Sequence, residues 1–202
     1  MRWLIDGFSA MGRDDGPQLE RDDLLLRPAR MADFSEWQDL RAASREFLAP
    51  WEPLWPQDDL TRPAFRKRVA QAKRDIAEQS AYALLIIAEG QMVGGITLAN
   101  IRRRAAQTGT LGYWMGAEFA GKGYMTRSVR LVSDFAFLQL QLDRLEAACL
   151  PENAASIRVL EKAGFKREGF ARAYLSIAGR RRDHLLFGLL NADFFPPNPG
   201  RV

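Results

Sequence analysis

The stretch GTLGYWMGAEFAGKGYMTRSVRLVSDFAFL, residues 109–138, contains the pattern that decides the fold. Its first part, residues 110–115, is a short apolar and aromatic run of the kind found in buried strands. Residues 116–122 interrupt that run, and a helical pattern begins at Gly123. Apolar residues then recur on one helical face, at Met125, Val129, Val132 and Ala136. We therefore predict a strand, a glycine-bearing turn and an amphipathic helix in succession.

The turn before this helix has the properties of an anion site. The first backbone N–H groups of a helix have no partner within it, and the helix dipole places partial positive charge there. Gly121 and Gly123 lack Cβ atoms, so a phosphate can approach the backbone closely, and Lys122 adds a positive charge. The alternative is that the glycines only form a tight turn, since two glycines near a helix start are by themselves weak evidence for phosphate binding.

A second stretch, LPENAASIRVLEKAGFKREG at residues 150–169, favours the anion site. It contains Asn153, Ser156 and the run EKAGF at 161–165. With GKGYMT at 121–126 some thirty residues earlier, these motifs resemble the GNAT acyl-CoA N-acyltransferases.

Two further segments narrow the resemblance to one branch, the ribosomal-protein-alanine N-acetyltransferases of RimJ type. FLAPWEP at 47–53 is similar to the N-terminal signature of that branch. YLSIAG at 174–179, followed by RDH at 182–184, is similar to its C-terminal hairpin. The resemblance covers roughly residues 20–195.

The resemblance implies an enzyme that transfers the acetyl group of acetyl-CoA to a protein N-terminal α-amine, in this branch an alanine of a ribosomal protein. Two other functions stay open: acetylation of a small amine such as a polyamine or aminoglycoside, and non-catalytic binding of acyl-CoA. Direct nucleic-acid recognition is not expected, because the arginine runs at 102–104 and 180–182 lack interleaved aromatic residues.

The resemblance also implies roles for individual residues. Backbone groups of Tyr113, Trp114 and Met115 hold the pantetheine arm and face the acetyl carbonyl. Asn153 and Ser156 face the pantetheine and the sulfur. The turn that holds the pyrophosphate consists of Gly121, Lys122, Gly123, Tyr124, Met125 and Thr126.

The chain departs from the family pattern at several positions. Ala120 stands where Gln or Arg often begins the phosphate loop. Leu160 stands where many relatives have a tyrosine acid, so Ser156 is the candidate proton donor to the leaving sulfur. Leu175 stands where the branch has a proposed glutamate base. Glu52 is then the candidate base, with Glu118 and ordered water as alternatives.

Two other residues have reactive side chains, and for each a structural role is the alternative to a catalytic one. His184, the one imidazole, follows Asp183 in a predicted strand, and a satisfied structural histidine is more common there than a catalytic one. Cys149, the one cysteine, has only apolar neighbours, which is typical of a buried core thiol. No metal site is expected.

Along the chain, the patterns predict an α/β fold with one mixed sheet of about seven strands and helices on both faces. Strands at 110–115 and 144–150 are joined by a helical crossover, so we expect them to be parallel neighbours. By resemblance this pair splays apart. Residues 1–20 are predicted to be an N-terminal arm, 21–195 a single domain and 196–202 a tail.

Several local features are predicted between these segments. Asp33, Thr61 and Asn153 are each expected to cap a helix. The proline- and tryptophan-rich segment 47–55 is not expected to be regular helix, and forms either a pocket wall or a packed corner. The arginine and lysine side chains at 66–74 are expected to form a solvated helix face.

Composition agrees with one globular domain of 202 residues, with 47% hydrophobic and 27% charged residues. The net charge of +4 suits an anionic ligand such as coenzyme A. A single cysteine cannot form an internal disulfide, and no apolar run approaches membrane-spanning length. The first seven residues do not resemble a signal peptide, so we expect a cytoplasmic protein.

Overall fold

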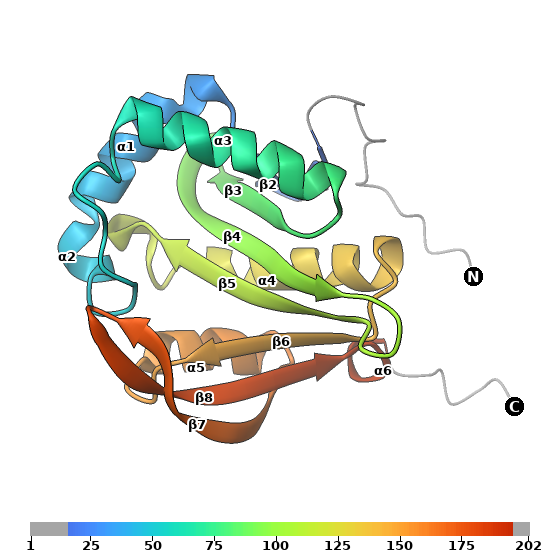
Figure 1. The fold of residues 1–202 in the computed structure, drawn as a ribbon. Coiled ribbons are helices and arrows are strands. Elements are labelled where there is room, and N and C mark those ends of the chain that lie inside the picture. The colour runs from blue at the N-terminus through green and yellow to red at the C-terminus, as the bar shows by residue number, and fades with distance from the viewer. Residues whose placement is uncertain (1–15, 196–202) are drawn as a thin grey trace, which may run out of the picture.

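An eight-stranded mixed sheet forms the centre of the structure, a computed structural model that describes residues 16–195 (Figure 1). The strand order is β1-β2-β3-β4-β5-β6-β8-β7. The strands are β1 (Leu19–Arg21), β2 (Leu24–Pro28), β3 (Tyr82–Ala88), β4 (Gln91–Arg102), β5 (Thr108–Met115), β6 (Arg144–Cys149), β7 (Lys166–Ile177) and β8 (Arg180–Leu190). The α-helices are α1 (Phe34–Ala43), α2 (Arg45–Leu48), α3 (Arg62–Ala77), α4 (Tyr124–Asp134), α5 (Ala154–Lys162) and α6 (Asn191–Phe194). Shorter helical segments are η1 (Met31–Asp33), η2 (Ala117–Phe119) and η3 (Phe135–Gln139).

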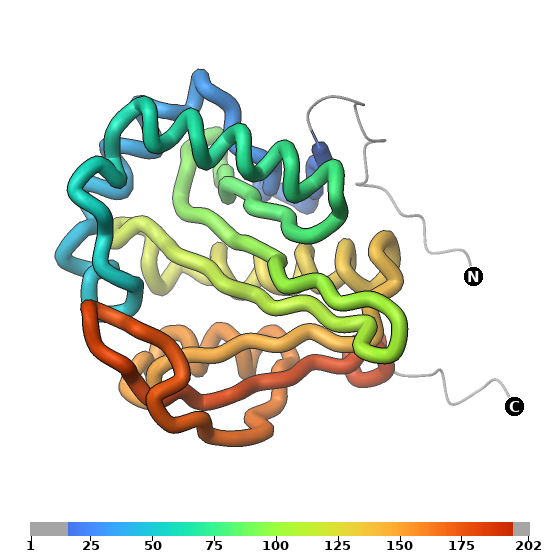
Figure 2. Tube along the Cα trace, in the orientation of Figure 1, coloured from blue at the N-terminus to red at the C-terminus, as the bar shows by residue number. Residues whose placement is uncertain are grey.

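Helices cover both faces of the sheet, and α4 and α5 pass behind the strands in Figure 2. On the opposite face, Phe65 of α3 and Leu85 of β3 belong to one buried cluster that also includes residues of α1. On the α4 face, Val129 packs in the main core with Leu84 and Ile86 of β3. Burial on both faces explains why β3 is a continuous apolar run and does not alternate with polar residues.

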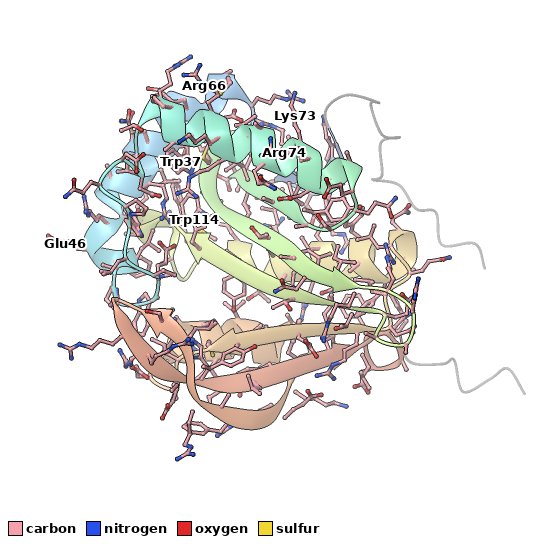
Figure 3. All side chains as sticks on the ribbon, viewed as in Figure 1. Trp37, Glu46, Arg66, Lys73, Arg74 and Trp114 are labelled. Carbon is pink, nitrogen blue, oxygen red and sulfur yellow. The ribbon has the colours of Figure 1, made fainter. Side chains whose placement is uncertain are left out.

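The outer side of α3 is charged, as the sequence predicts. Arg66, Lys73 and Arg74 are all exposed on this helix (Figure 3). Trp37 of α1 is buried and contacts the Phe65 ring, with 4.8 Å between the ring centroids. The helix therefore turns its apolar face to the sheet and its basic face to solvent.

The parallel strands β5 and β6 separate before either strand ends. Their pairing stops at Leu111 and Ala147, although β5 continues to Met115 and β6 to Cys149. Over this part each strand keeps its outer neighbour, β4 for β5 and β8 for β6. The predicted splayed pair is thus confirmed, and the edges that face the opening have no strand partner among the described residues.

The sheet has eight strands where the sequence indicates about seven. The additional strand is β1, which pairs antiparallel with β2 and begins at Leu19, within the predicted N-terminal arm. The rest of that arm up to residue 15, and the predicted tail from residue 196, lie outside the described residues.

Two local predictions need correction. Asp33 occupies the N-cap position of α1, but its side chain forms no capping hydrogen bond there. Its carboxylate accepts a hydrogen bond from the Arg30 N–H and pairs with the Arg27 guanidinium, because the chain forms the 3₁₀ turn η1 before α1 begins. The segment predicted to be non-helical from residue 47 begins inside the short helix α2, because its first proline comes only at Pro50.

Phe65 is expected to be a large contributor to stability, since it is 1% exposed and lies between α1, α3 and the sheet. Phe65→Ala should lower the free energy of unfolding by ~3–5 kcal/mol, because it leaves a cavity that the surroundings fill only partly. Phe170→Ala, on a side chain that is 50% exposed, is the matched control and should be nearly neutral. Urea denaturation of both variants tests this, and equal losses would contradict the assignment of this core.

Candidate active site

A cavity of about 630 Å³ lies where β5 and β6 separate. Its volume is in the range typical of small-molecule sites. Its walls come from the ends of β5 and β6, the first turn of α4, the length of α5, the end of α2 with the following loop, and the β7–β8 hairpin. Eleven of the twelve site residues predicted from sequence line it: Glu52, Tyr113, Trp114, Met115, Gly121, Gly123, Tyr124, Met125, Thr126, Asn153 and Ser156.

The glycine turn before α4 forms one end of the cavity. Gly121 and Gly123 have φ values of +79° and +86°, and no other atom lies within 4 Å of where a Cβ would be. The positive φ angles account for glycine at both positions, and the open space leaves room for a ligand against the backbone. Gly123 is the N-cap of α4, so the unpaired N–H groups of the first helical turn lie at the cavity wall.

Lys122 is the predicted residue that does not line this cavity. Its ammonium lies 5.2 Å from the centroid of the Phe119 ring, which is itself part of the wall. The positive charge therefore stays beside the glycine turn, at the rim.

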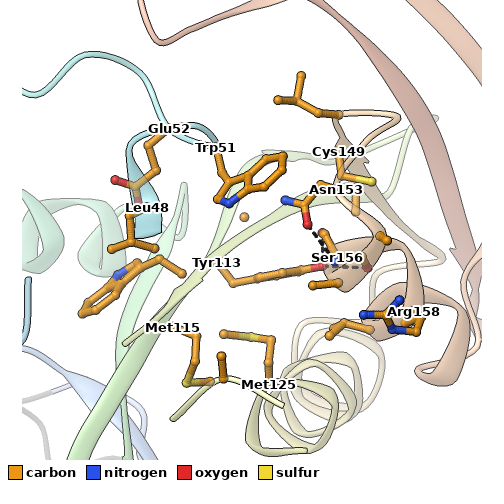
Figure 4. A pocket seen from close by; sticks show the side chains of 18 of the residues that line it. Leu48, Trp51, Glu52, Tyr113, Met115, Met125, Cys149, Asn153, Ser156 and Arg158 are labelled. Atoms are coloured by element: carbon orange, nitrogen blue, oxygen red, sulfur yellow. Dashed lines mark hydrogen bonds between the residues drawn. The ribbon is translucent and has the colours of Figure 1, made fainter. Parts of the chain in front are cut away.

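Two hydroxyl groups meet at the middle of the cavity (Figure 4). The Tyr113 hydroxyl of β5 lies 2.7 Å from Ser156 Oγ in the first turn of α5. Asn153 Oδ1 accepts a 3.0 Å hydrogen bond from the Ser156 backbone N–H, so the predicted N-cap is confirmed. Burial raises the pKa of Tyr113, and the phenol therefore remains protonated at neutral pH.

The sequence-based prediction assigned only backbone groups of Tyr113 to the site and missed its side chain. The available signal was the alternation of side chains along a strand. Tyr113 packs toward the main core with Met115, whereas Trp114 packs with the cluster on the opposite face.

Cys149 also lines this cavity as a free thiol, and it is buried as predicted. Burial raises the pKa of Cys149 to about 11. At neutral pH the side chain is therefore a protonated thiol and not a nucleophilic thiolate.

Glu52 lies in the wall on the α1 side of the cavity, where its carboxylate is fully engaged. Arg41 donates to both carboxylate oxygens at 2.8 Å, and Trp55 Nε1 donates at 2.6 Å. The Arg41 guanidinium in turn lies 4.0 Å from the Trp55 ring centroid and 4.8 Å from that of Trp114. Trp51 lines the cavity whereas Trp55 does not, so the first forms pocket wall and the second a packed corner.

The backbone of Glu52 holds the loop against the β7–β8 hairpin. Its carbonyl oxygen accepts a 2.9 Å hydrogen bond from the N–H of Ala178 in the hairpin turn. Glu52 thus connects α1, the loop after α2 and the hairpin. Of the alternative bases, Glu118 is exposed and is not part of the wall, whereas His184 of β8 is buried and lines the cavity.

Within residues 16–195, no three His, Cys, Asp or Glu side chains are grouped so that they could hold a metal ion. The same part of the chain contains no helix that is long and apolar enough to span a membrane.

Comparison with known proteins identifies the family. The sequence model of the acetyltransferase (GNAT) domain matches residues 23–166. The chain belongs to the GNAT acetyltransferases. These enzymes use acetyl-CoA as acyl donor, and the glycine turn, the open strand pair and the hydroxyl groups of this GNAT enzyme fit that substrate.

Relatives of this GNAT enzyme include ribosomal-protein acetyltransferases. It is 35% identical to the probable N-acetyltransferase YjcK of Bacillus subtilis, over 87% of this chain and 98% of that one. It is 29% identical to the ribosomal protein uS5-alanine N-acetyltransferase of Escherichia coli, over 89% and 93%. Mycobacterium smegmatis RimJ, solved in complex with CoA-disulfide, superimposes with a TM-score of 0.82 at 30% identity, over 87% and 85%.

Gly123→Glu is expected to abolish stabilisation by coenzyme A, because it places a side chain and a negative charge in the glycine turn where we expect the phosphates to bind. For the unsubstituted protein, ligand at ~100 times its Kd should add roughly 2.7 kcal/mol, measured as a thermal shift. Gly90→Glu is the control: Gly90 has a similar φ of +78° and open surroundings but lies outside the cavity wall. A Gly123→Glu protein that keeps its shift would refute this placement.

Proposed function

We propose that this enzyme acetylates the N-terminal α-amine of a protein, with the N-terminal alanine of a ribosomal protein as its acceptor. The main support for the proposal is that one cavity contains both the predicted acetyl-CoA site and the predicted acceptor site. The glycine turn and the open strand edge lie at one end, and residues of the two segments that resemble the RimJ-type branch lie at the other. The names of the relatives support the choice of acceptor. A ribosomal-protein acceptor implies a cytoplasmic enzyme.

In this proposal, backbone groups bind the acyl donor, acetyl-CoA. The N–H groups of the first turn of α4 and the turn at Gly121 and Gly123 bind the pyrophosphate, since a helix N-terminus favours anions. The edge of β5 at 113–115 binds the amide groups of the pantetheine arm in the manner of an added strand. Asn153 keeps the first turn of α5, and with it Ser156, at the cavity wall.

In this proposal, the acceptor binds against an apolar wall of fixed shape. Phe47, Trp51, Leu175 and Ile177 line this part of the cavity. We assign Glu52 to holding this wall, because its carboxylate is bound to Arg41 and Trp55 and its carbonyl to the hairpin. An apolar wall of this kind suits a small first residue such as alanine.

The hydroxyl pair supplies the proton to the leaving group. The amine nitrogen bonds to the thioester carbonyl carbon, the C–S bond breaks and the thiolate takes a proton. In our proposal Tyr113 donates its hydrogen bond to Ser156 Oγ, which leaves the Ser156 proton free to be donated to the sulfur. The dipole of α5 also favours the developing negative charge at this place.

A peptide that begins with alanine should be acetylated faster than other amines. An α-amine has a pKa near ~8 and a lysine amine near ~10.4, so far more of the α-amine is neutral at pH 7. The test compares three acceptors: an alanine-initiated peptide without lysine, the same peptide N-terminally blocked with one internal lysine, and spermidine. Faster thiol release with lysine or spermidine would contradict the proposed acceptor. If none of the three amines causes thiol release although coenzyme A still binds, the protein is a non-catalytic acyl-CoA-binding protein.

Ser156→Ala and Tyr113→Phe should each lower kcat on the order of 10²-fold, the usual contribution of a positioned proton donor. The KM for acetyl-CoA should change little, because one neutral hydrogen bond contributes only ~1 kcal/mol. If the two hydroxyls act as a unit, the double variant should lose little more than either single one.

The control is Tyr82→Phe, which removes the hydroxyl of another buried tyrosine, one outside the cavity wall. It should leave kcat unchanged. An unchanged kcat in Ser156→Ala, together with a lower melting temperature, would show that Ser156 only stabilises α5.

A further inference from the structure

We propose that His184 is the general base of the reaction and takes the proton from the acceptor amine through Nε2. This inference rests on the proposed function only in requiring an amine acceptor, and it does not depend on which amine that is. The hydroxyl pair supplies a proton to the sulfur, but it cannot remove one from the nitrogen while it stays protonated. The acceptor amine therefore needs a separate proton acceptor in the same cavity.

The place of His184 in the fold puts its side chain in the acceptor part of the cavity. Its neighbour Leu185 pairs with Cys149 across β6 and β8, and both of these side chains face the main core. Side chains alternate along a strand, so His184 is directed to the opposite face of the sheet. Leu175 of β7 pairs with Arg182, two residues from His184, and so lies on that same face. Both Leu175 and His184 line the cavity.

A hydrogen bond fixes the protonation pattern of the imidazole. His184 Nδ1 lies 3.0 Å from the carbonyl oxygen of Arg182. A carbonyl oxygen can only accept, so Nδ1 carries the hydrogen and Nε2 of the neutral ring has a free lone pair. No group in residues 16–195 forms a hydrogen bond with Nε2. Tyr174 contacts the ring edge-on at 5.6 Å and restricts its orientation.

The other ionisable groups of the cavity wall are less suited to accept this proton. Both carboxylate oxygens of Glu52 are taken by Arg41. Glu152 is exposed and forms an ion pair with Arg182. Tyr113, Tyr124 and Cys149 have raised pKa values and stay protonated at neutral pH. The remaining wall groups, the Arg158 guanidinium and the Lys162 ammonium, are hydrogen-bond donors without an acceptor lone pair. His184 is thus the cavity group that combines a free lone pair with a buried, fixed position.

In the proposed step, one proton leaves the acceptor amine and another reaches the leaving sulfur. Nε2 of His184 accepts a proton from the amine nitrogen as the new C–N bond forms. The C–S bond breaks, and the sulfur receives its proton from Ser156. His184 then releases its proton to solvent, and the hydroxyl pair recovers one, so that acetyl-CoA and amine become amide and free coenzyme A.

His184→Asn is the variant that separates catalysis from structure. Its amide N–H replaces Nδ1–H as a donor to Arg182, but it has no counterpart of Nε2. We expect kcat to fall on the order of 10²–10³-fold, while the thermal shift caused by coenzyme A stays unchanged. Adding Leu175→Glu to this variant places a carboxylate on the same hairpin face, where the present side chain is 44% exposed. It should recover roughly tenfold of the lost kcat, because a nearby carboxylate also acts as a base.

Two outcomes would overturn the assignment. One is a His184→Asn enzyme with wild-type kcat. The other is a variant that loses both kcat and its response to coenzyme A and is not rescued by Leu175→Glu, which would show a structural role. All variants are assayed on the alanine peptide and on spermidine, and compared with wild type on whichever amine reacts. Failure of the peptide alone would contradict the proposed acceptor and leave this comparison intact.

Discussion

The separation of β5 and β6 is the constraint on which the rest of the site depends. Past Leu111 and Ala147 the two strands keep their outer partners but not each other. Backbone N–H and C=O groups that are buried without a partner cost about 1–3 kcal/mol each, so a stable opening requires water or a ligand that pairs with them. The amide groups of a pantetheine arm match this need, which links the fold directly to its acyl donor.

Because side chains alternate along a strand, β5 contributes residues of the site to both faces of the sheet. Tyr113 faces α5, where its hydroxyl meets Ser156. Trp114 faces the other side, where its ring lies beside the Arg41 guanidinium that binds Glu52. The proposed proton donor and the proposed acceptor wall are therefore both positioned by the same short stretch of β5.

Most ionisable side chains of the cavity wall are either paired with an opposite charge or uncharged. Arg41 and Glu52 neutralise each other in the wall between two indole rings. Burial keeps Tyr113 and Cys149 protonated by raising the pKa of each. In this neutral part of the wall the remaining hydrogen bonds are strengthened, because the effective dielectric constant is low.

The sequence by itself determined the local features of this protein. The glycine turn before α4 and the Asn153 cap of α5 follow from residues close together in the chain and from the spacing of apolar side chains. The parallel pairing of β5 and β6 follows from the helical crossover that joins them. Only the tertiary structure decided that Tyr113 reaches Ser156, 43 residues away, and that Arg41 occupies the carboxylate of Glu52, 11 residues away. Such contacts depend on how a strand and a loop pack against separate helices, and periodicity along the chain contains no information about the partner on another element.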